Sequence, residues 1–270
     1  MVFKKIKKIL LMFIVVIVFL GAFQFYNNMQ SKCRKSSYTY EDNSLPKEFN
    51  GFKIGYLSDL NLVNKDDLTK LEKAVNDINE QEVDMILFGG DIYNNSSFEI
   101  DKVSSILRKL KSSYGKFALL GEKDQSESTN CNNLLTEAGF EVLHNELRTI
   151  YYNDASIQLI GLENNGDCSG VINDTNKDTY KIAFVHQPDF FKEVSKHEVN
   201  LQLSGHTLGG YYRIPFIGGI VTKDKGSEYV SGKHKLNNTT LYISNGFNKE
   251  ATQNYRFLTH DEFNIITLKR

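Results

Sequence analysis

Several potential metal ligands in this sequence stand directly after short apolar runs, where buried strands are expected to end. The segment Leu203–Gly210 is a clear example: the run ends in Ser204, Gly205 and His206, and two further glycines allow a tight turn. A histidine found once in this setting is weak evidence for a ligand site. Other apolar runs end in the same way, and the residues at or just after their ends are Asp59, Asn61, Asp91, Glu122, Lys123, Asp124, His186 and His206.

The apolar runs in the first half of the chain alternate with amphipathic helical patterns. Strands are predicted over residues 52–57, 84–88 and 116–120. Helices are predicted over 66–80, across Ile100–Leu110 and around 132–138, from apolar residues at helical spacing. Because strands and helices alternate, we expect parallel strands whose carboxyl ends lie along one edge of a sheet. Ligands from separate segments are therefore expected to meet at that edge.

Short strands replace this alternation after Glu141. They are predicted over 148–152, 156–162, 180–185, 199–203, 241–244 and 263–268. An Asn-Asp turn joins the first two into a hairpin, and Pro188 favours the start of a helix after the third. The third and fourth strands lead to His186 and His206, so the second half of the chain also supplies potential ligands.

Together, these strand ends offer carboxylate, amide and imidazole groups from five separate segments. Oxygen and imidazole ligands suit Mn, Fe, Zn or a similar divalent ion. Any one of the acidic residues has an ordinary alternative role as a turn or helix-cap residue. Their coincidence at five successive strand ends favours a metal centre over that alternative.

The composition is that of an ordinary globular protein without a strong charge field. Of the 270 residues, 40% are hydrophobic and 24% are charged, and the formal net charge is −1. We therefore expect no nucleic-acid partner. Cys33, Cys131 and Cys168 show no Cys-x-x-Cys spacing, which argues against a zinc–thiolate site. They are expected to be free thiols, and the alternative is a Cys131–Cys168 disulfide outside the cell.

The N-terminus carries a membrane-targeting pattern. Four lysines within Met1–Lys8 precede an apolar or small run from Ile9 to Phe23, as in a short transmembrane helix or a signal-peptide core. Bulky aromatic residues in the candidate cleavage region favour an uncleaved anchor. The lysines favour a cytoplasmic N-terminus, which makes this a single-pass protein of the cell membrane with its folded part outside. Residues 1–29 are then the tail and anchor, 30–50 a polar linker and 51–270 the folded domain.

In their order and spacing, the strand-end residues resemble the motifs of the calcineurin-like metallophosphoesterases, most closely a membrane-anchored bacterial branch. That family carries D-x-H, G-D-x-x-D/N, G-N-H-D/E, a separate H and G-H-x-H. The matching segments are Asp59–Asn61, Gly90–Asn94, Gly121–Asp124, His186 and Gly205–Leu208. The resemblance implies an α/β fold built as a two-sheet β-sandwich flanked by helices, here preceded by an N-terminal transmembrane helix.

The resemblance also implies a site for two metal ions, and the two ligand sets are not equally preserved. One set corresponds to Asp91, Glu122, His186 and His206. The other corresponds to Asp59, Asn61, Asp91 and Leu208. All members of the first set can bind a divalent ion, whereas the leucine side chain in the second cannot. We therefore expect one tightly bound ion, with a second held weakly or not at all.

The catalytic positions of the family motif are also substituted. Lys123 stands where the family has a histidine that stabilises the phosphoryl oxygens and protonates the leaving oxygen, and Asp124 follows it. A lysine supplies positive charge to a phosphate, but it is a poor general acid unless burial or nearby cations lower its pKa. We take Lys123 and Asp124 as the candidate catalytic residues, with Lys123 facing the phosphate.

Two functions follow from these observations. The first is metal-dependent hydrolysis of a phosphate ester or pyrophosphate at the outer membrane surface, on a phosphorylated small molecule or lipid. The second is a catalytically degenerate family member that binds a phosphorylated ligand or a protein partner. An unrelated metal-binding surface protein is the remaining alternative. The sequence does not choose a substrate among phosphomonoesters, phosphodiesters, nucleotides and lipid pyrophosphates.

Overall fold

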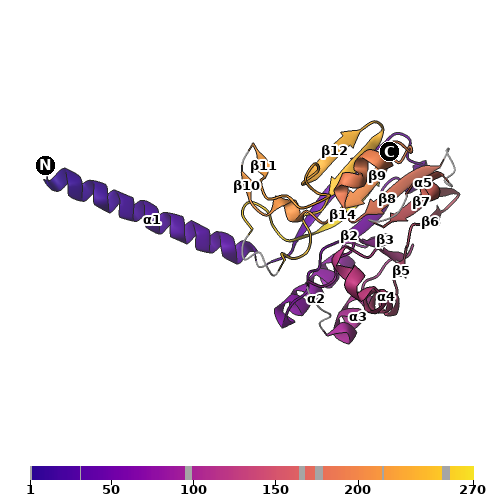
Figure 1. Ribbon diagram of the computed structural model, residues 1–270, viewed down its shortest axis with the longest axis horizontal. Helices are drawn as coiled ribbons and strands as arrows, with labels where there is room; N and C mark the ends of the chain where they lie inside the picture. Colours follow the sequence, from indigo (N-terminus) through magenta and orange to yellow (C-terminus); the bar gives the residue numbers. More distant parts are fainter. Residues whose placement is uncertain are drawn as a thin grey trace. The chain divides into compact units, whose positions relative to one another are not determined.

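The computed structural model describes residues 2–30, 32–94, 99–163, 168–173, 179–214, 216–250 and 256–270 (Figure 1). The chain divides into two compact units, Met1–Lys32 and Cys33–Arg270. Helix α1 (Val2–Gln30) forms the first unit. Its segment Lys5–Phe23 has the length and apolar composition of a membrane span, and none of it is buried. The N-terminal apolar helix expected from the sequence is therefore present.

A six-stranded sheet forms one layer of the second unit. Its strands lie in the order β1 (Arg34–Glu41), β14 (Glu262–Lys269), β2 (Lys53–Leu57), β3 (Met85–Phe88), β4 (Lys116–Ala118) and β5 (Glu141–Val142). The four strands from β2 to β5 are parallel. Helices α2 (Lys65–Asn79), α3 (Ile100–Arg108) and α4 (Ser128–Glu137) lie between them in the chain. This confirms the predicted alternation of parallel strands and helices.

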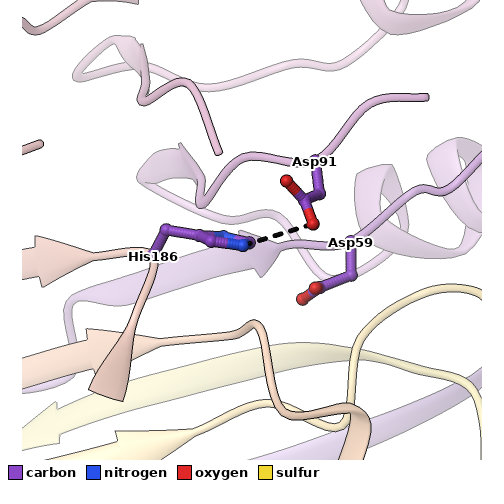
Figure 2. A group of neighbouring side chains, drawn as sticks. All are labelled: Asp59, Asp91 and His186. Carbon is purple, nitrogen blue, oxygen red and sulfur yellow. Dashed lines mark ion pairs between the residues drawn. The ribbon is translucent and has the colours of Figure 1, made fainter. Parts of the chain in front are cut away.

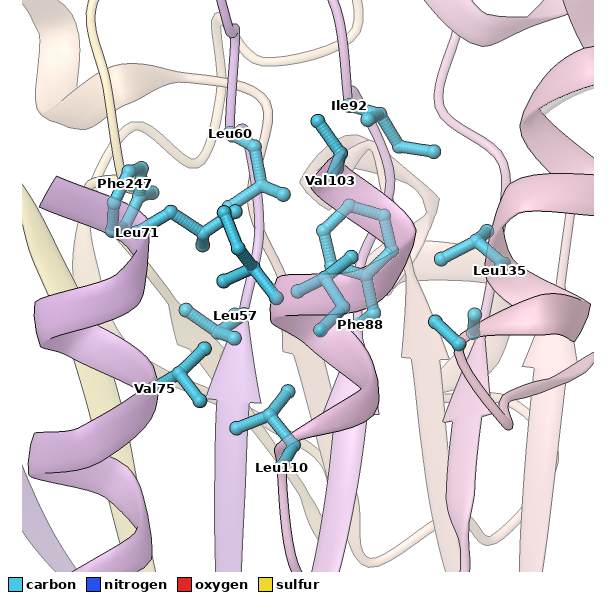
Figure 3. Close-up of a cluster of buried hydrophobic side chains, with 14 of the residues drawn as sticks. Leu57, Leu60, Leu71, Val75, Phe88, Ile92, Val103, Leu110, Leu135 and Phe247 are labelled. Carbon is cyan, nitrogen blue, oxygen red and sulfur yellow. The ribbon is translucent and has the colours of Figure 1, made fainter. Parts of the chain in front are cut away.

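These helices cover the outer face of the first sheet with a continuous apolar core. Figure 3 shows Leu57 and Phe88 of the strands against Leu71 and Val75 of α2 and Val103 of α3. The N-terminus of α2 is closed by a capping box in which Asn64 and Asp67 satisfy each other's backbone N–H groups. The amphipathic pattern read from the sequence therefore corresponds to a helix face that is buried on a sheet.

A second six-stranded sheet lies on the other face of the first. Its order is β12 (Gly232–Leu236), β13 (Thr239–Ile243), β9 (Leu201–Ser204), β8 (Tyr180–Val185), β7 (Ala155–Leu162) and β6 (Glu146–Tyr152). The strands β6 and β7 form the predicted antiparallel hairpin, and β7, β8, β9 and β13 are parallel.

Side-chain alternation along the strands builds the core between the sheets. In β3, Met85 and Leu87 belong to the cluster shared with the second sheet, whereas Ile86 and Phe88 belong to the cluster under the helices. Two stacked sheets with helices outside them confirm the expected sandwich.

Short elements complete the unit and carry several of the connections. They are helices α5 (Cys168–Asn173) and α6 (Phe191–Val194), the 3₁₀ helices η1 (Lys47–Phe49), η2 (Lys123–Glu127), η3 (Pro188–Phe190) and η4 (Leu208–Gly210), and the small hairpin of β10 (Arg213–Ile214) and β11 (Gly218–Gly219). The helix expected after Pro188 is the η3–α6 pair.

The segment expected to be a linker belongs largely to the folded unit. Residues 34–41 form β1, which pairs in parallel with β14 over its whole length, and the compact unit begins at Cys33. Phe49, later in the same segment, is fully buried in the core between the sheets. The expected boundary at residue 51 is therefore wrong, because a polar edge strand lacks the apolar run by which buried strands are recognised.

Two of the three cysteines are free thiols, as expected. Cys33 is half-buried, and Cys131 is buried with its Sγ 3.7 Å from a carboxylate oxygen of Asp124. The side chain of Cys168 lies outside the described residues, and so does the Cys131–Cys168 pairing considered from the sequence.

Candidate metal centre

Three ligand-type side chains converge where strands of the two sheets end. Asp59 follows β2, Asp91 follows β3 and His186 follows β8. One ligand atom from each lies within 4.8 Å of the others, and Figure 2 shows Asp91 and His186 pointing toward each other with Asp59 beside them. All three residues are fully buried. The edge expected in one sheet is in fact shared, because the carboxylates come from the first sheet and the imidazole from the second.

Tight turns hold the backbone at this edge. Asp59, Asp91 and His206 have φ angles of 54°, 60° and 69°, in the left-handed region that residues other than glycine rarely adopt. A Cβ on Gly121 would collide with the carboxylate of Asp91, and one on Gly205 would collide with that of Asp59. Strained backbone of this kind gathers at functional sites. Because Gly121 and Gly205 have no side chain, they leave space for the carboxylates of Asp91 and Asp59.

Backbone carbonyls orient both histidine rings. Nδ1 of His186 donates a hydrogen bond to the carbonyl oxygen of Gly89 at 2.7 Å, which leaves Nε2 directed at Asp91, 3.3 Å from its Oδ2. Nε2 of His206 donates to the carbonyl oxygen of Asp224 at 2.8 Å, which leaves its Nδ1 without a proton. Because a carbonyl oxygen can only accept, these bonds fix the tautomers. Orientation of the ring by a second hydrogen bond is typical of metal-binding histidines.

Three buried ligand atoms have no hydrogen-bond partner within the part of the chain that the structure describes. They are Oδ2 of Asp91, Nε2 of His186 and Nδ1 of His206. Buried polar atoms nearly always have a partner, and those that lack one call for an explanation. A carboxylate oxygen and two imidazole nitrogens are suitable ligands for Mn, Fe or Zn. The residues present therefore fit a divalent ion.

The charges in the site keep Asp91 ionised and His206 neutral, which are the protonation states that bind a metal ion. Burial disfavours ionisation of Asp91, yet His186 and Lys123 hold the pKa of this carboxyl well below its usual range. Burial, and then the charge on His186, lower the pKa of His206. Burial also opposes the charged form of His186, but the adjacent Asp91 raises the pKa of His186 to about 9. A metal ion at this position therefore competes with one proton, on His186.

Glu122 lies on the solvent side of the site and is not one of the three converging residues. Its side chain is 41% exposed, and its Oε1 is 3.6 Å from Nδ1 of His206. Its Oε2 accepts a hydrogen bond from the amide of Gln187 at 3.0 Å. Glu122 is thus within reach of the free nitrogen of His206, while the other expected ligands are buried beneath it.

The ammonium of Lys123 contacts oxygens of the protein, although we expected it to face the substrate phosphate. Its Nζ donates to Oδ1 of Asn61 at 2.7 Å and lies 2.6 Å from Oε1 of Glu250. It is also 3.6 Å from Oδ2 of Asp91. Burial lowers the pKa of Lys123, but the charges of Asp91 and Glu250 outweigh burial and raise it. A lysine with a raised pKa is a poor proton donor at neutral pH.

Glu250 is a residue of the site that the sequence did not reveal. Its Oε1 also accepts from Nζ of Lys223 at 2.7 Å, and its Oε2 accepts from the hydroxyl of Tyr211 at 2.6 Å. Burial favours the neutral acid, but Lys223 and the hydrogen bonds from Lys123, Lys223 and Tyr211 lower the pKa of Glu250 to about 2. Glu250 lies in a loop beyond β13 and matches no motif, so no sequence signal marks it.

Asp124 positions the backbone of the site. Its carboxylate accepts hydrogen bonds from the N–H groups of Asp91 at 2.8 Å, Ile92 at 2.9 Å and Gly121 at 2.9 Å. Burial, and then the charge on Asp91, raise the pKa of Asp124 to about 6. The structure therefore gives this candidate catalytic residue a positioning role, since both of its oxygens are directed at backbone groups.

Replacing Asp124 by alanine is expected to lower the free energy of unfolding by about 3 kcal/mol or more. Three buried N–H groups would lose their acceptor, and each costs about 1–3 kcal/mol when it is left unsatisfied. Urea unfolding measures the change. The exposed Asp154 provides a control, because Asp154→Ala should stay within about 0.5 kcal/mol of the unmodified protein. Equal stability of the two variants would contradict the positioning role of Asp124.

Two stacked sheets with helices outside them thus bring two carboxylates and a histidine together at their strand ends. The family model for calcineurin-like phosphoesterases matches residues 52–210. An uncharacterized metallophosphoesterase of Bacillus subtilis, YkuE, is 32% identical over 243 residues, which cover 87% of this chain and 85% of the relative. The phosphodiesterase YaeI of Escherichia coli is 29% identical over 215 residues, 77% of each chain.

The chain belongs to the calcineurin-like phosphoesterase family, as the strand-end motifs suggested. The family model covers more than half of the chain, and it ends just after the second histidine segment. The solved structure of GAP50, the anchor in the inner membrane complex of Plasmodium, aligns with a TM-score of 0.50 at 12% identity over 80% of each chain. At this identity the likeness concerns the fold alone.

Proposed function

We propose that this protein is a phosphoesterase that works with one tightly bound divalent ion. Asp91, His186 and His206 would hold the ion, with carboxylate oxygens of Asp59 and Glu122 beside them. When bound, such an ion polarises a phosphoryl oxygen and lowers the pKa of an attacking water. The protein's own contribution is to keep Asp91 ionised and to direct one nitrogen of each histidine into the site.

The observation that carries this proposal is the set of three buried ligand atoms without hydrogen-bond partners, one each on Asp91, His186 and His206. A purely structural role for these residues would leave Asp91 and His186 with only the ion pair between them, 3.3 Å long, and Nδ1 of His206 with no hydrogen bond, and buried polar atoms without hydrogen bonds cost free energy. A metal ion would supply a partner to Asp91 and His186, and the ring of His206, 5.1 Å from that of His186 between centroids, would add a further ligand. The family membership supplies the reaction class, which is hydrolysis of a phosphoester.

The second ion of the family pattern is proposed to be weak or absent. Leu208, at the position of the missing histidine, is fully buried, and a Cβ on Gly246 would collide with its Cδ2. The leucine therefore fills space at the edge of the site without offering a donor atom. The remaining ligands of that set are Asp59, Asn61 and Asp91, and Asn61 already accepts a hydrogen bond from Lys123.

We further propose a substrate that combines a phosphate with an apolar portion. The hairpin of β10 and β11 exposes Ile214, Phe216 and Ile217, with Ile220 next to it. This hairpin follows Tyr211 in the chain, whose hydroxyl binds Glu250 in the site, and it lies against η4, since a Cβ on Gly219 would be 2.9 Å from the backbone oxygen of Gly209. Exposed apolar side chains gathered in this way are uncommon on a surface that meets only water. Their nearness to the site favours a lipid phosphate or lipid pyrophosphate over a nucleotide.

The catalytically degenerate alternative is favoured by one specific observation, the contacts of Lys123. Its ammonium is engaged by Asn61, Asp91 and Glu250, and it replaces the general acid of the family motif. A site without a proton donor for the leaving oxygen binds a phosphate more readily than it cleaves the ester. On this alternative the protein binds a phosphorylated ligand or partner.

Metal analysis of the purified protein, joined to a phosphoesterase assay, tests these functions against each other. Aryl phosphates and a short-chain lipid phosphate would be offered with Mn²⁺, Fe²⁺, Zn²⁺ and Mg²⁺ in turn. We expect one ion per chain and turnover that depends on it. Tight binding of phosphate without turnover on any substrate would favour the binding protein. Absence of any bound ion would contradict the proposed metal centre, whether the protein hydrolyses a phosphoester or only binds one.

The soluble unit is expected to face the outside of the cell, with α1 as its membrane anchor. The lysines that precede the apolar segment favour a cytoplasmic N-terminus. Protease added to intact cells should therefore remove the unit that begins at Cys33, while a cytoplasmic marker protein stays whole. Permeabilised cells provide the control for cleavage. A unit that is protected in intact cells and cleaved after permeabilisation would show the opposite orientation.

A further inference from the structure

We propose that the ammonium of Lys123 is a built-in cation that takes the place of a second divalent ion beside the metal centre. The inference depends on the proposed function only in placing one divalent ion at Asp91. It explains why this site holds one ion, and it gives Lys123 a role other than contact with substrate.

The surroundings of the ammonium are those of a small cation. Nζ of Lys123 has Oδ1 of Asn61 at 2.7 Å, Oε1 of Glu250 at 2.6 Å and Oδ2 of Asp91 at 3.6 Å. The lysine side chain is only 17% exposed, and the side chain of Asp91 is not exposed at all. Amide and carboxylate oxygens converging on one point are also the ligands that Mg²⁺, Mn²⁺ and Ca²⁺ prefer. The ammonium thus lies in an oxygen-lined position that a hard divalent ion would suit.

The ammonium shares one oxygen atom with the metal centre. Oδ2 of Asp91 is 3.6 Å from Nζ of Lys123 and 3.3 Å from Nε2 of His186. One carboxylate oxygen therefore lies between the position proposed for the metal and the position of the ammonium. A second divalent ion bound beside this oxygen would lie at contact distance from the positively charged ammonium, and like charges so close strongly disfavour each other. The lysine consequently excludes the second ion by charge as well as by volume.

The residues behind Lys123 fix the ammonium in this position. Glu250 is held by the hydroxyl of Tyr211 and by Nζ of Lys223, and Nζ of Lys223 also donates to the backbone carbonyl of His206 at 2.8 Å. Asp91 and Glu250 carry two negative charges, and Lys123 and Lys223 carry two positive ones. The charges of these four side chains therefore balance without a second metal ion. Removal of one lysine leaves a net negative, oxygen-lined position.

Manganese binding to the full-length protein in detergent micelles tests this inference. The unmodified protein, saturated with Mn²⁺ and then dialysed, should retain one ion per chain and show the spectrum of an isolated Mn²⁺ in electron paramagnetic resonance. Lys123→Ala should retain two ions and show the spin-coupled spectrum of two neighbouring ions. Lys123→Gln, which keeps a polar side chain and adds an oxygen ligand, should behave in the same way and covers the case in which the alanine variant does not fold.

Lys116→Ala is the matched control, because Lys116 is a half-buried lysine whose Nζ binds the backbone carbonyl of Ala138 away from the site. It should retain one ion. Two ions in the unmodified protein, or one ion in folded Lys123 variants, would overturn the inference and leave the proposed metal centre standing. No ion in the unmodified protein would instead overturn the proposed function. The two failures are therefore distinguishable.

Discussion

Replacing His186 by alanine is expected to lower the affinity for the divalent ion by more than about 100-fold and to abolish metal-dependent hydrolysis. Loss of an outer-shell partner alone typically costs about 10–100-fold in metal affinity, and His186 is proposed as a direct ligand. Its Nε2 is fully buried and lies 3.3 Å from Oδ2 of Asp91, and among the described residues no other imidazole lies within ion-pair distance of that oxygen. Calorimetric titration with Mn²⁺ and Zn²⁺ measures the affinity.

His234→Ala is the control for this variant, because His234 hydrogen-bonds the backbone of Ser231 and belongs to β12, outside the site. It should bind the metal as the unmodified protein does. Circular dichroism should show that both variants are folded. If folded His186→Ala binds the ion as tightly as the control, the metal centre described here is wrong.

Restoring the family residues at three positions is expected to bring in a second ion and to raise phosphoesterase activity by about 100-fold or more, the lower range for general acid catalysis. The changes are Asn61→His, Leu208→His and Lys123→His. The first two add imidazole ligands beside Asp59 and Asp91, and the third removes the ammonium and supplies a proton donor. Metal analysis and an aryl-phosphate assay measure the two effects separately.

The contacts of Lys123 make the order of these changes informative. Because its ammonium binds Asn61 and Glu250, the pair Asn61→His and Leu208→His should gain little metal while Lys123 is present. A polar ring in place of the buried Leu208 is expected to cost about 1–3 kcal/mol of stability. A folded triple variant with two ions and no activity on any phosphoester would favour the binding function. If the unmodified protein is already as active as the triple variant, the residues by which this chain departs from the family motif have no effect on catalysis.

The sequence predicted the parts of the fold that follow from continuous apolar patterns. Buried parallel strands such as β3 and β8 are almost entirely apolar, with Lys181 of β8 as the one charged residue, because both of their faces are covered. Their ends could therefore be located, and with them Asp91 and His186. Edge strands give no such signal. In β12, for example, lysine and histidine residues alternate between half-buried and exposed positions.

The arrangement inside the site was harder to predict because it depends on residues far apart in the chain. The order of the motifs showed that Lys123 replaces a histidine, but its direction is set by Glu250, which lies in a loop of the C-terminal half. Asp124 looked catalytic from its place in a motif, whereas its hydrogen bonds to Asp91, Ile92 and Gly121 are visible only in three dimensions. Residue types could be read from the sequence, and their partners could not.

The short connection between α1 and β1 limits where the folded unit can be cut from the proposed membrane anchor. Helix α1 ends at Gln30 and β1 begins at Arg34, so only a very short stretch separates the two. A protease that cut at residue 50 would remove the strand that covers the edge of β14, and it would remove Phe49 from the core between the sheets. In the shed fragment the largely buried, more apolar β14 would replace the polar β1 as the edge strand, and an apolar edge promotes aggregation. Release of an intact, soluble form is therefore confined to cleavage between Gln30 and Arg34.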